Sequence, residues 1–393
     1  MTSLRLRLSA PVWLLLASLG CSPAVSGDED GGAPSATQDD AADVLDGDAS
    51  APPAPEDAGA PPAEAESGAT PDGGTDLGAD PVDDDEGAAP PGEDAPDPAE
   101  PSPPPATPPP LPSYSGGVCP SLVVGPTKAT SLNEGFPSSG EARDFRVLVP
   151  DNYDDSEAWP VLFFFHWLNA SGKSMIDDGE LETAIEQQRF IAVVPERLKK
   201  SNGSKAYQFD WPFVETWGAE KELVFFDDML ACVSEQFTVD PARVHVMGVS
   251  AGGLWVTYLM SSDRAERVAS LETLSGGLGR DGLGVWEIEF QPSPHKYPAL
   301  VLWGGSTDWL GINFEQASKR LRDALLENGH FVVTCTHDEG HAIPPVENTA
   351  GRTRFESLWS FLLDHPYGTT TSTTPYQGGL PAVYPSWCGL AQP

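Results

Sequence analysis

From residue 114 onward, short apolar runs alternate with segments in which apolar residues recur every three or four positions. Several runs are apolar throughout, which is typical of strands covered on both faces. The spacing of Phe314, Ala317 and Leu321 is that of a helix with one buried stripe. Because the two patterns alternate and no repeat is present, residues 114–393 are predicted to form one α/β domain with a mostly parallel central sheet.

The individual elements follow from the same patterns. Strands are expected at Phe145–Val149, Val161–Phe165, Phe190–Val194, Val244–Met247, Val268–Leu274, Ala299–Trp303 and Phe331–Thr334. Helices are expected near residues 180–188, 219–236, 251–262, 313–328 and 352–364.

Residues 1–21 have the pattern of a secretory signal peptide, because two arginines precede an apolar run that ends at small residues. The run is too short to cross a bilayer comfortably. Its end, Leu-Ala-Ser-Leu-Gly-Cys, is similar to the signal of bacterial lipoproteins and predicts that Cys21 carries a lipid anchor. The alternative is ordinary cleavage near Gly20. We therefore expect an exported protein, either an outer-membrane or cell-surface lipoprotein or a secreted one.

Residues 22–113 contain 23 of the 59 acidic residues, no Lys or Arg, and many Ala, Pro and Gly. Such a segment cannot bury enough apolar surface to fold, so it is predicted to be a disordered linker that acts as a tether. The alternative is an acidic interaction tail. Residues 114–393 retain 36 acidic and 20 basic residues, a net charge of −16, which makes nucleic acid an unfavourable partner.

Five cysteines are present. If Cys21 carries lipid, Cys119, Cys232, Cys335 and Cys388 are left, and an even number in an exported chain predicts two disulfides. Their spacing leaves all three pairings open. Cys119 and Cys388 lie near the ends of the predicted domain, so one of them is expected to hold a terminus in place.

The sequence Gly-Val-Ser-Ala-Gly, residues 248–252, lies between a predicted strand and a predicted helix. In such an elbow the flanking glycines relieve crowding, and the serine is raised above the edge of the sheet at the start of a helix. The helix N-terminus favours the negative charge that develops during attack. Ser250 is therefore the candidate nucleophile, and the alternative is a tight turn without chemistry.

A serine nucleophile needs a base, and histidine is the usual one. In the chain order Ser, Asp or Glu, His, the base follows the last strand. His341 has this position in the loop after the run at 331–334. The alternatives are His337, His330 and His245.

The acid that orients the base is expected where the preceding strand ends, and Asp308 follows the run at 299–303 and two glycines. Asp338 and Glu339 are alternatives that lie close to the histidine in sequence. Two backbone N–H groups are expected to hold the oxyanion, namely those of Ala251 and Trp167.

These stretches together resemble the secreted esterases of the polyhydroxybutyrate depolymerase and feruloyl or acetylxylan esterase group. The resemblance rests on residues 150–153, 165–167, 226–228, 239–244, 248–253, 304–308 and 340–341. It implies an α/β-hydrolase fold with helices on both faces of the sheet, and a triad of Ser250, Asp308 and His341. It also implies that neither a metal nor an organic cofactor is needed. Residues 196–218 depart from the pattern of the group.

The prediction is a serine esterase that cleaves feruloyl or acetyl esters of polysaccharide, or a polyhydroxyalkanoate-type polyester, through an acyl-enzyme. The alternatives are a serine peptidase of the prolyl-oligopeptidase type, a catalytically silent surface-binding lipoprotein and a structural envelope protein. Five tryptophans near the predicted catalytic edge are candidates either for substrate stacking or for core packing. They are Trp167, Trp211, Trp217, Trp255 and Trp309.

Overall fold

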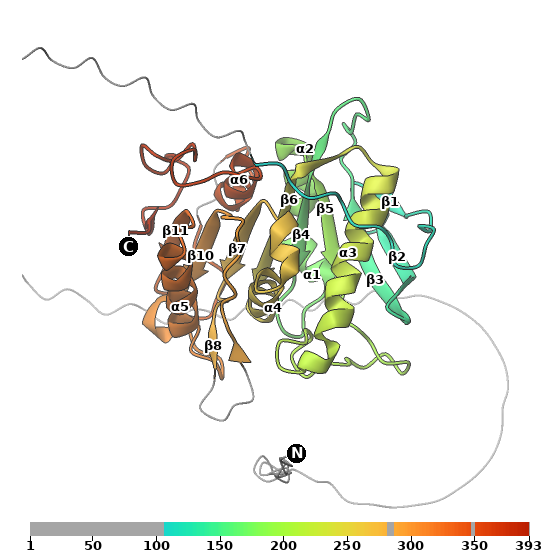
Figure 1. Ribbon diagram of the computed structural model, residues 1–393, viewed down its shortest axis with the longest axis horizontal. Coiled ribbons are helices and arrows are strands. Elements are labelled where there is room, and N and C mark those ends of the chain that lie inside the picture. The colour runs from blue at the N-terminus through green and yellow to red at the C-terminus, as the bar shows by residue number, and fades with distance from the viewer. Residues whose placement is uncertain (1–105, 281–286, 347–349, 393) are drawn as a thin grey trace, which may run out of the picture. The chain divides into compact units, whose positions relative to one another are not determined.

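The structure is a computed structural model that describes residues 106–280, 287–346 and 350–392 (Figure 1). The predicted signal peptide, Cys21 and nearly all of the predicted linker lie outside the described residues. Ten strands form the main sheet in the order β1-β3-β5-β4-β6-β7-β10-β11-β12, and β2 pairs with β3.

The strands of the main sheet are β1 (Val124–Gly125), β2 (Leu132–Ser138), β3 (Glu141–Leu148), β4 (Trp159–Phe165), β5 (Ile191–Pro195), β6 (Val239–Val249), β7 (Ser270–Leu274), β10 (Ala299–Trp303), β11 (Val332–Thr336) and β12 (Cys388–Leu390). The short strands β8 (Gly279–Arg280) and β9 (Glu287–Ile288) pair separately. The helices are α1 (Gly172–Asp178), α2 (Leu181–Gln188), α3 (Ala219–Gln236), α4 (Ala251–Met260), α5 (Phe314–Glu327) and α6 (Glu356–Asp364).

The six strands β5, β4, β6, β7, β10 and β11 run parallel to their neighbours, whereas β3 and β12 add antiparallel strands at the two ends of this block. All parallel strands therefore end at one edge of the sheet. The loops that leave this edge include those that carry the candidate site.

Helices cover both faces of the sheet, as predicted. Alternate side chains of β4 enter two separate apolar cores: Val161 and Phe163 face the core beneath α3, α4 and α5, whereas Leu162 and Phe164 face the core beneath α1, α2 and α6. In Figure 1, α3 and α4 lie in front of the sheet and α1 lies behind it. Burial on both faces explains why the sequence of β4 is apolar at nearly every position.

All seven strands and five helices expected from the pattern are present. The bounds of α3 and β10 agree with the expected ones, and the others differ by a few residues at their ends. The pattern did not predict α1, the seven-residue strand β2 or the short strands β1, β8, β9 and β12. Of these, β2 contains Gly135 and Pro137 and shifts its register against β3, so its sequence lacks a regular alternation. None of the described helices is long and apolar enough to cross a membrane.

Two disulfides form, as predicted, and their pairing is Cys119–Cys232 and Cys335–Cys388. Each joins a cysteine near one end of the folded chain to a regular element, Cys119 to Cys232 on α3 and Cys388 to Cys335 on β11. Both terminal cysteines therefore hold a terminus in place. Closing loops of this length stabilises a fold mainly by restricting the unfolded chain.

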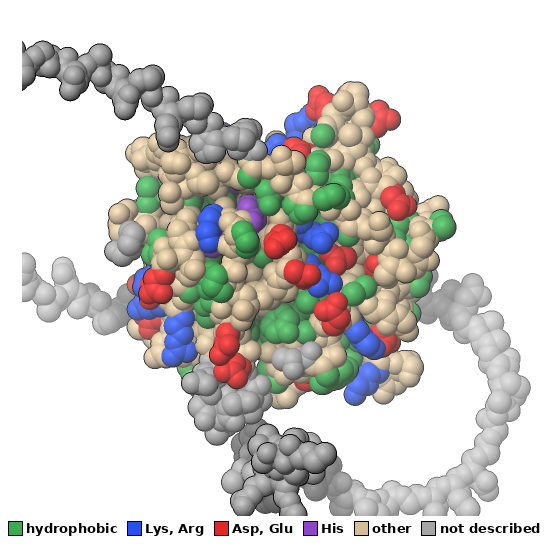
Figure 2. Space-filling model, viewed as in Figure 1, with side chains coloured by type: hydrophobic (Ala, Val, Ile, Leu, Met, Phe, Trp, Pro, Cys, Tyr) green, Lys and Arg blue, Asp and Glu red, His purple; other side chains and the backbone are tan. Residues whose placement is uncertain are grey.

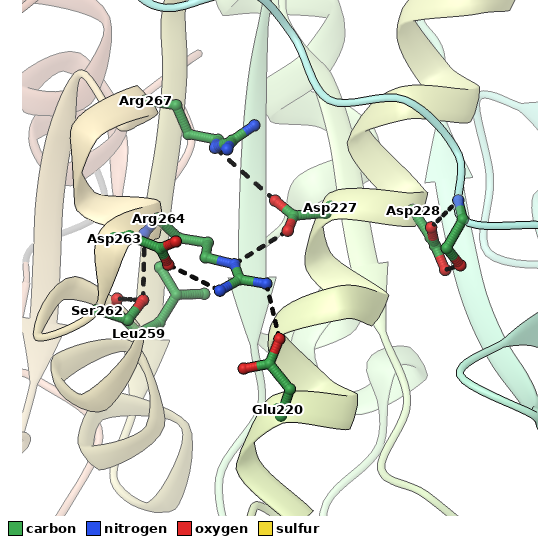
Figure 3. A network of polar contacts seen from close by, with 9 residues as sticks. Glu220, Asp227, Asp228, Leu259, Ser262, Asp263, Arg264 and Arg267 are labelled. Carbon is green, nitrogen blue, oxygen red and sulfur yellow. Dashed lines mark hydrogen bonds and ion pairs between the residues drawn. The ribbon is translucent and has the colours of Figure 1, made fainter.

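Two adjacent aspartates on α3 connect that helix to three other parts of the chain. Asp227 accepts a hydrogen bond of 3.0 Å from Arg264, which lies in the short 3-10 helix after α4 (Figure 3). Buried Asp228 accepts bonds from the backbone N–H and hydroxyl of Ser115 and from the hydroxyl of Ser138. The pair therefore holds α3 to these three parts of the chain. On the face seen in Figure 2, acidic and basic side chains are interspersed.

Asp228→Ala is predicted to lower the free energy of unfolding by about 3 kcal/mol, because it leaves two hydroxyls and a backbone N–H without their charged acceptor. Urea denaturation measures the change. Asp263→Ala is the control, because its carboxylate makes an exposed ion pair with Arg264, which contributes at most about 1 kcal/mol. Equal destabilisation by the two substitutions would contradict the structural role of Asp228.

Candidate active site

Ser250 lies between the last residue of β6 and the first residue of α4, and its backbone has φ 55° and ψ −114°. This conformation is strained for a residue with a side chain. The glycines on either side leave no room for a β-carbon. One added to Gly248 would lie 2.2 Å from the carbonyl oxygen of Gly252, and one added to Gly252 would lie 2.2 Å from that of Phe165. The turn between β6 and α4 is therefore as tight as predicted, and both glycines are needed to relieve its crowding.

The three side chains proposed as a triad form one chain of hydrogen bonds. Ser250 Oγ lies 2.8 Å from His341 Nε2, and His341 Nδ1 lies 2.6 Å from Asp308 Oδ1. The imidazole also stacks on the ring of Phe314, with ring centroids 4.4 Å apart. The structure thus brings together residues 33 and 91 positions apart in the sequence, in the order and orientation that proton transfer requires.

The carboxylate of Asp308 is buried, and its second oxygen is also occupied. Oδ2 accepts hydrogen bonds of 2.8 Å from the Ser275 hydroxyl and from the backbone N–H of Gly304. Burial raises the pKa of Asp308, but the bonds from His341, Gly304 and Ser275 outweigh it and hold the pKa below its ordinary value. The carboxylate therefore stays ionised beside the imidazole.

The alternative bases and acids lie elsewhere. His245, His330 and His337 are buried, and burial lowers the pKa of each, to about 4 for His330. His245 hydrogen-bonds to a serine of the neighbouring strand, and His330 hydrogen-bonds to a backbone carbonyl. His337 accepts a hydrogen bond from the backbone N–H of Glu339. The side chains of Asp338 and Glu339 are exposed. The geometry therefore favours His341 and Asp308.

The two predicted oxyanion donors belong to segments that touch. Ala251 begins α4, and Trp167 follows the end of β4. The next residue of the helix, Gly252, is so close to the strand end that a β-carbon there would lie 2.2 Å from the Phe165 oxygen and 2.7 Å from the His166 oxygen. Within the part of the chain that the structure describes, neither the Ala251 nor the Trp167 N–H donates to a protein acceptor. Both are free for a substrate oxygen.

Two cavities meet at Ser250. The larger has a volume of about 340 Å³ and the smaller about 130 Å³, and Ser250, Leu168 and Leu310 line both. Aliphatic and aromatic side chains make up most of the walls. Among the described residues that line the larger cavity, apart from the histidine, only Asp178 has an ionisable side chain. Other residues that line it include Met175, Met247, Val249, Leu274, Leu302, Phe355, Leu358 and Trp359.

Exposed apolar side chains follow both Asp308 and His341 in the sequence. Trp309 and Leu310 directly follow Asp308 and are 63% and 59% exposed, and Ile343 follows His341 by two residues and is 53% exposed. Leu310 and Ile343 also line the cavity wall. The loops that carry the proposed acid and base therefore also carry exposed apolar side chains, Trp309, Leu310 and Ile343, which we call the apolar rim.

The five tryptophans named above have different positions. Trp211 and Trp255 are fully buried, and neither lines either of the two cavities at Ser250. Trp167 lines the larger cavity, whereas Trp217 and Trp309 are exposed. Core packing is therefore the correct interpretation for two of the five.

The sequence did not identify Ser275 as a partner of Asp308. Its one available signal was its position directly after β7, at the same edge of the sheet as the elbow. The structure adds that Ser275 has φ 51°, which is uncommon for a residue other than glycine and is often found at functional sites.

No family model matches the chain. Feruloyl esterase D of Neurospora crassa is 27% identical over 167 residues, which are 42% of this chain and 54% of that protein. Feruloyl esterase C of Emericella nidulans is 28% identical over 179 residues, 42% of this chain and 58% of that protein. The chain therefore spans about half the length of the curated relatives that it matches.

Among solved structures, a pOPH variant in complex with DMSO superposes with a TM-score of 0.55 at 18% identity, covering 70% of this chain and 97% of that one. At this identity the likeness concerns the fold. The predicted α/β-hydrolase fold is confirmed, and so is the predicted similarity to feruloyl esterases.

Ser275→Ala is predicted to raise the pH at which the protein loses stability when the solution is acidified. The variant removes one of the bonds that lower the pKa of Asp308, so the carboxylate becomes protonated at a higher pH and no longer orients His341. For the same reason, the stability contributed by ionised Asp308, present above its unfolded pKa, is lost sooner as the pH falls.

The measurement is the free energy of unfolding by urea as a function of pH between about pH 3 and 8. Ser270→Ala is the matched control, because this buried serine lies on the same strand, β7, and bonds to His245 instead. If the profiles of Ser275→Ala and the parent protein superimpose, Ser275 does not support Asp308.

Proposed function

We propose that this protein is a serine esterase that hydrolyses carboxylic esters through an acyl-enzyme. The observation that carries the proposal is the chain of hydrogen bonds from Ser250 through His341 to Asp308, placed at an elbow on the edge of the sheet. The similarity to proteins named feruloyl esterases supports the same conclusion.

In the proposed first step, Ser250 Oγ attacks the ester carbonyl carbon while His341 Nε2 takes the hydroxyl proton. Asp308 fixes the Nδ1–H tautomer of the imidazole and stabilises its positive charge. The Ala251 and Trp167 N–H groups donate to the carbonyl oxygen as it becomes negative.

Collapse of this intermediate breaks the bond between the carbonyl carbon and the alkoxy oxygen, and His341 gives its proton to the departing alcohol. Water then repeats the attack on the acyl-enzyme, with His341 as base, and releases the carboxylic acid and free Ser250. No metal or organic cofactor takes part in the proposed reaction.

The cavities favour a neutral ester with an apolar group on at least one side of the reacting carbonyl. A charged acyl group would lose its hydration among the apolar walls without gaining a partner of opposite charge. The larger cavity can hold a ring or a short chain, which is compatible with a feruloyl ester or with a segment of polyester. We propose feruloyl or acetyl esters of polysaccharide, or a polyhydroxyalkanoate-type polyester, as the substrate class.

Export is part of the proposal. The two disulfides are typical of proteins outside the reducing cytosol. A lipid on Cys21, with residues 22–113 as a tether, would hold the enzyme at the outer membrane or the cell surface, and cleavage without lipidation would release it.

Ser250→Ala is predicted to lower kcat at least about a thousandfold on every ester that the parent protein cleaves, because the nucleophile is lost. The oxidised protein is assayed with nitrophenyl acetate and butyrate, methyl ferulate, acetylated xylan and polyhydroxybutyrate. Ser261→Ala, at the other end of α4, is the matched control, since its hydroxyl bonds only within the helix.

The assay also separates the alternatives. Cleavage of a proline nitroanilide peptide but of no ester would indicate a peptidase. A folded protein that cleaves neither would indicate a binding or structural protein, and activity that survives in Ser250→Ala would exclude the proposed nucleophile.

Trp309→Ser is predicted to reduce hydrolysis of insoluble polyester particles severalfold and to change kcat/KM for nitrophenyl butyrate less than about twofold. The reason is that an exposed indole beside the site gains burial only against an extended apolar surface. Trp217→Ser is the matched control, because Trp217 is 67% exposed but lies in the short 3-10 helix before α3, far in the sequence from Asp308 and His341. Equal effects of the two variants on the particles would contradict a role for the rim.

A further inference from the structure

We propose that Trp211 is a positioning residue that orients one of the two oxyanion donors, the N–H of Trp167. This inference rests on the esterase function proposed above and extends it to residues 196–218, which depart from the sequence pattern of the esterase group. Trp211 acts through the backbone and does not touch the substrate.

Trp211 lies in the long connection between β5 and α3 and is fully buried beneath the end of β4. Its indole Nε1–H donates a 2.9 Å hydrogen bond to the carbonyl oxygen of His166. The indole also packs against the rings of Phe165 and His166, with centroid distances of 5.3 and 4.9 Å. Ring packing and the hydrogen bond therefore fix the Trp211 indole relative to the carbonyl of His166.

The carbonyl of His166 and the N–H of Trp167 belong to the same peptide group. A trans peptide is planar, so its carbonyl and its N–H point in opposite directions. A bond that fixes the carbonyl toward Trp211 therefore also fixes the direction of the N–H. A donor on a carbonyl oxygen also polarises the amide and strengthens the N–H as a donor in its turn.

The same peptide is held from its other sides. A β-carbon on Gly252 would lie 2.7 Å from the His166 oxygen, so the first turn of α4 presses against this carbonyl. The His166 ring nitrogen Nδ1 lies 2.8 Å from the Trp167 carbonyl, which can only accept, so Nδ1 carries the proton. Burial lowers the pKa of His166, so its imidazole is neutral. The peptide has little freedom to rotate.

The residue before Trp211 holds the far end of the same loop. Asp210 Oδ2 accepts a 2.5 Å hydrogen bond from the backbone N–H of Asn169, and Oδ1 pairs with Arg197 at 3.0 Å. Asn169 and Asp210 both have left-handed backbones, with φ of 61° and 69°. Such strain persists only where surrounding contacts impose it. Adjacent residues of one connection thus clamp the loop at His166 and at Asn169.

The test is Trp211→Phe, which keeps an aromatic ring against Phe165 but removes the N–H donor. The expected result is a fall in kcat of about 10- to 100-fold with KM changed less than about threefold, because the oxyanion forms only during the reaction. Affinity for an aryl trifluoromethyl ketone is expected to fall in parallel with kcat. This inhibitor bonds to Ser250 Oγ, and its carbonyl oxygen becomes an oxyanion.

Trp159→Phe is the matched control. Trp159 is also buried, and it begins β4, the strand whose end packs on Trp211. Its Nε1–H donates a 2.8 Å hydrogen bond to a backbone carbonyl, that of Asp154. It is expected to lose stability, measured by thermal unfolding, with kcat and inhibitor affinity unchanged. If both variants lower kcat equally, or if Trp211→Phe keeps the parent kcat and inhibitor affinity, the proposal for Trp211 is wrong.

The two proposals fail in different ways. Ester hydrolysis that is abolished in Ser250→Ala but unaffected in Trp211→Phe overturns only the positioning role. Ester hydrolysis that is absent from the parent protein or survives in Ser250→Ala overturns the esterase function itself. Trp211→Tyr provides a second variant if Trp211→Phe does not fold, since it also lacks the indole N–H and keeps a large ring.

Discussion

The candidate site depends on one close contact, that between the first turn of α4 and the end of β4. Gly252 packs so tightly against the carbonyls of Phe165 and His166 that no side chain fits between them. Gly252 directly follows Ala251, so this contact places the start of α4 beside the segment that contains Trp167, at the turn where Ser250 has its strained backbone. The proposed nucleophile and its proposed oxyanion donors thus depend on a single packing constraint.

A second constraint is electrostatic. Burying the carboxylate of Asp308 is costly, and an unpaired buried charge would take up a proton instead. Three donors from three parts of the chain offset this cost, namely the imidazole of His341, the hydroxyl of Ser275 and the N–H of Gly304. These donors lie on loops that follow neighbouring parallel strands. The parallel order of the sheet therefore brings them together and keeps Asp308 ionised.

The sequence predicted the features that arise from local order. Ser250 lies in a compact motif between a strand and a helix, and Asp308 and His341 each follow an apolar run in a fixed chain order. Strands apolar at every position were recognisable because both faces of the sheet are covered. The three-residue β12 was not recognisable, because it owes its place to pairing with β11 and to the disulfide between Cys335 and Cys388.

Other features depend on contacts between distant segments, which no local pattern records. The disulfide pairing is one example, since spacing alone left three possibilities. Trp211 is another: its segment has no helical or strand periodicity, and its contact with His166 spans 45 residues. The departure of residues 196–218 from the resemblance was visible in the sequence, but its physical meaning required the position of the indole.

The apolar cavities also bear on how the proposed reaction ends. The walls that favour a neutral acyl group disfavour the carboxylate that hydrolysis produces, because an ion loses hydration there without a cationic partner. Asp178 on the cavity wall and the net charge of −16 over residues 114–393 add repulsion. The proposed reaction converts a neutral ester into an anionic carboxylate. The same apolar cavity walls therefore favour binding of the substrate and release of the product.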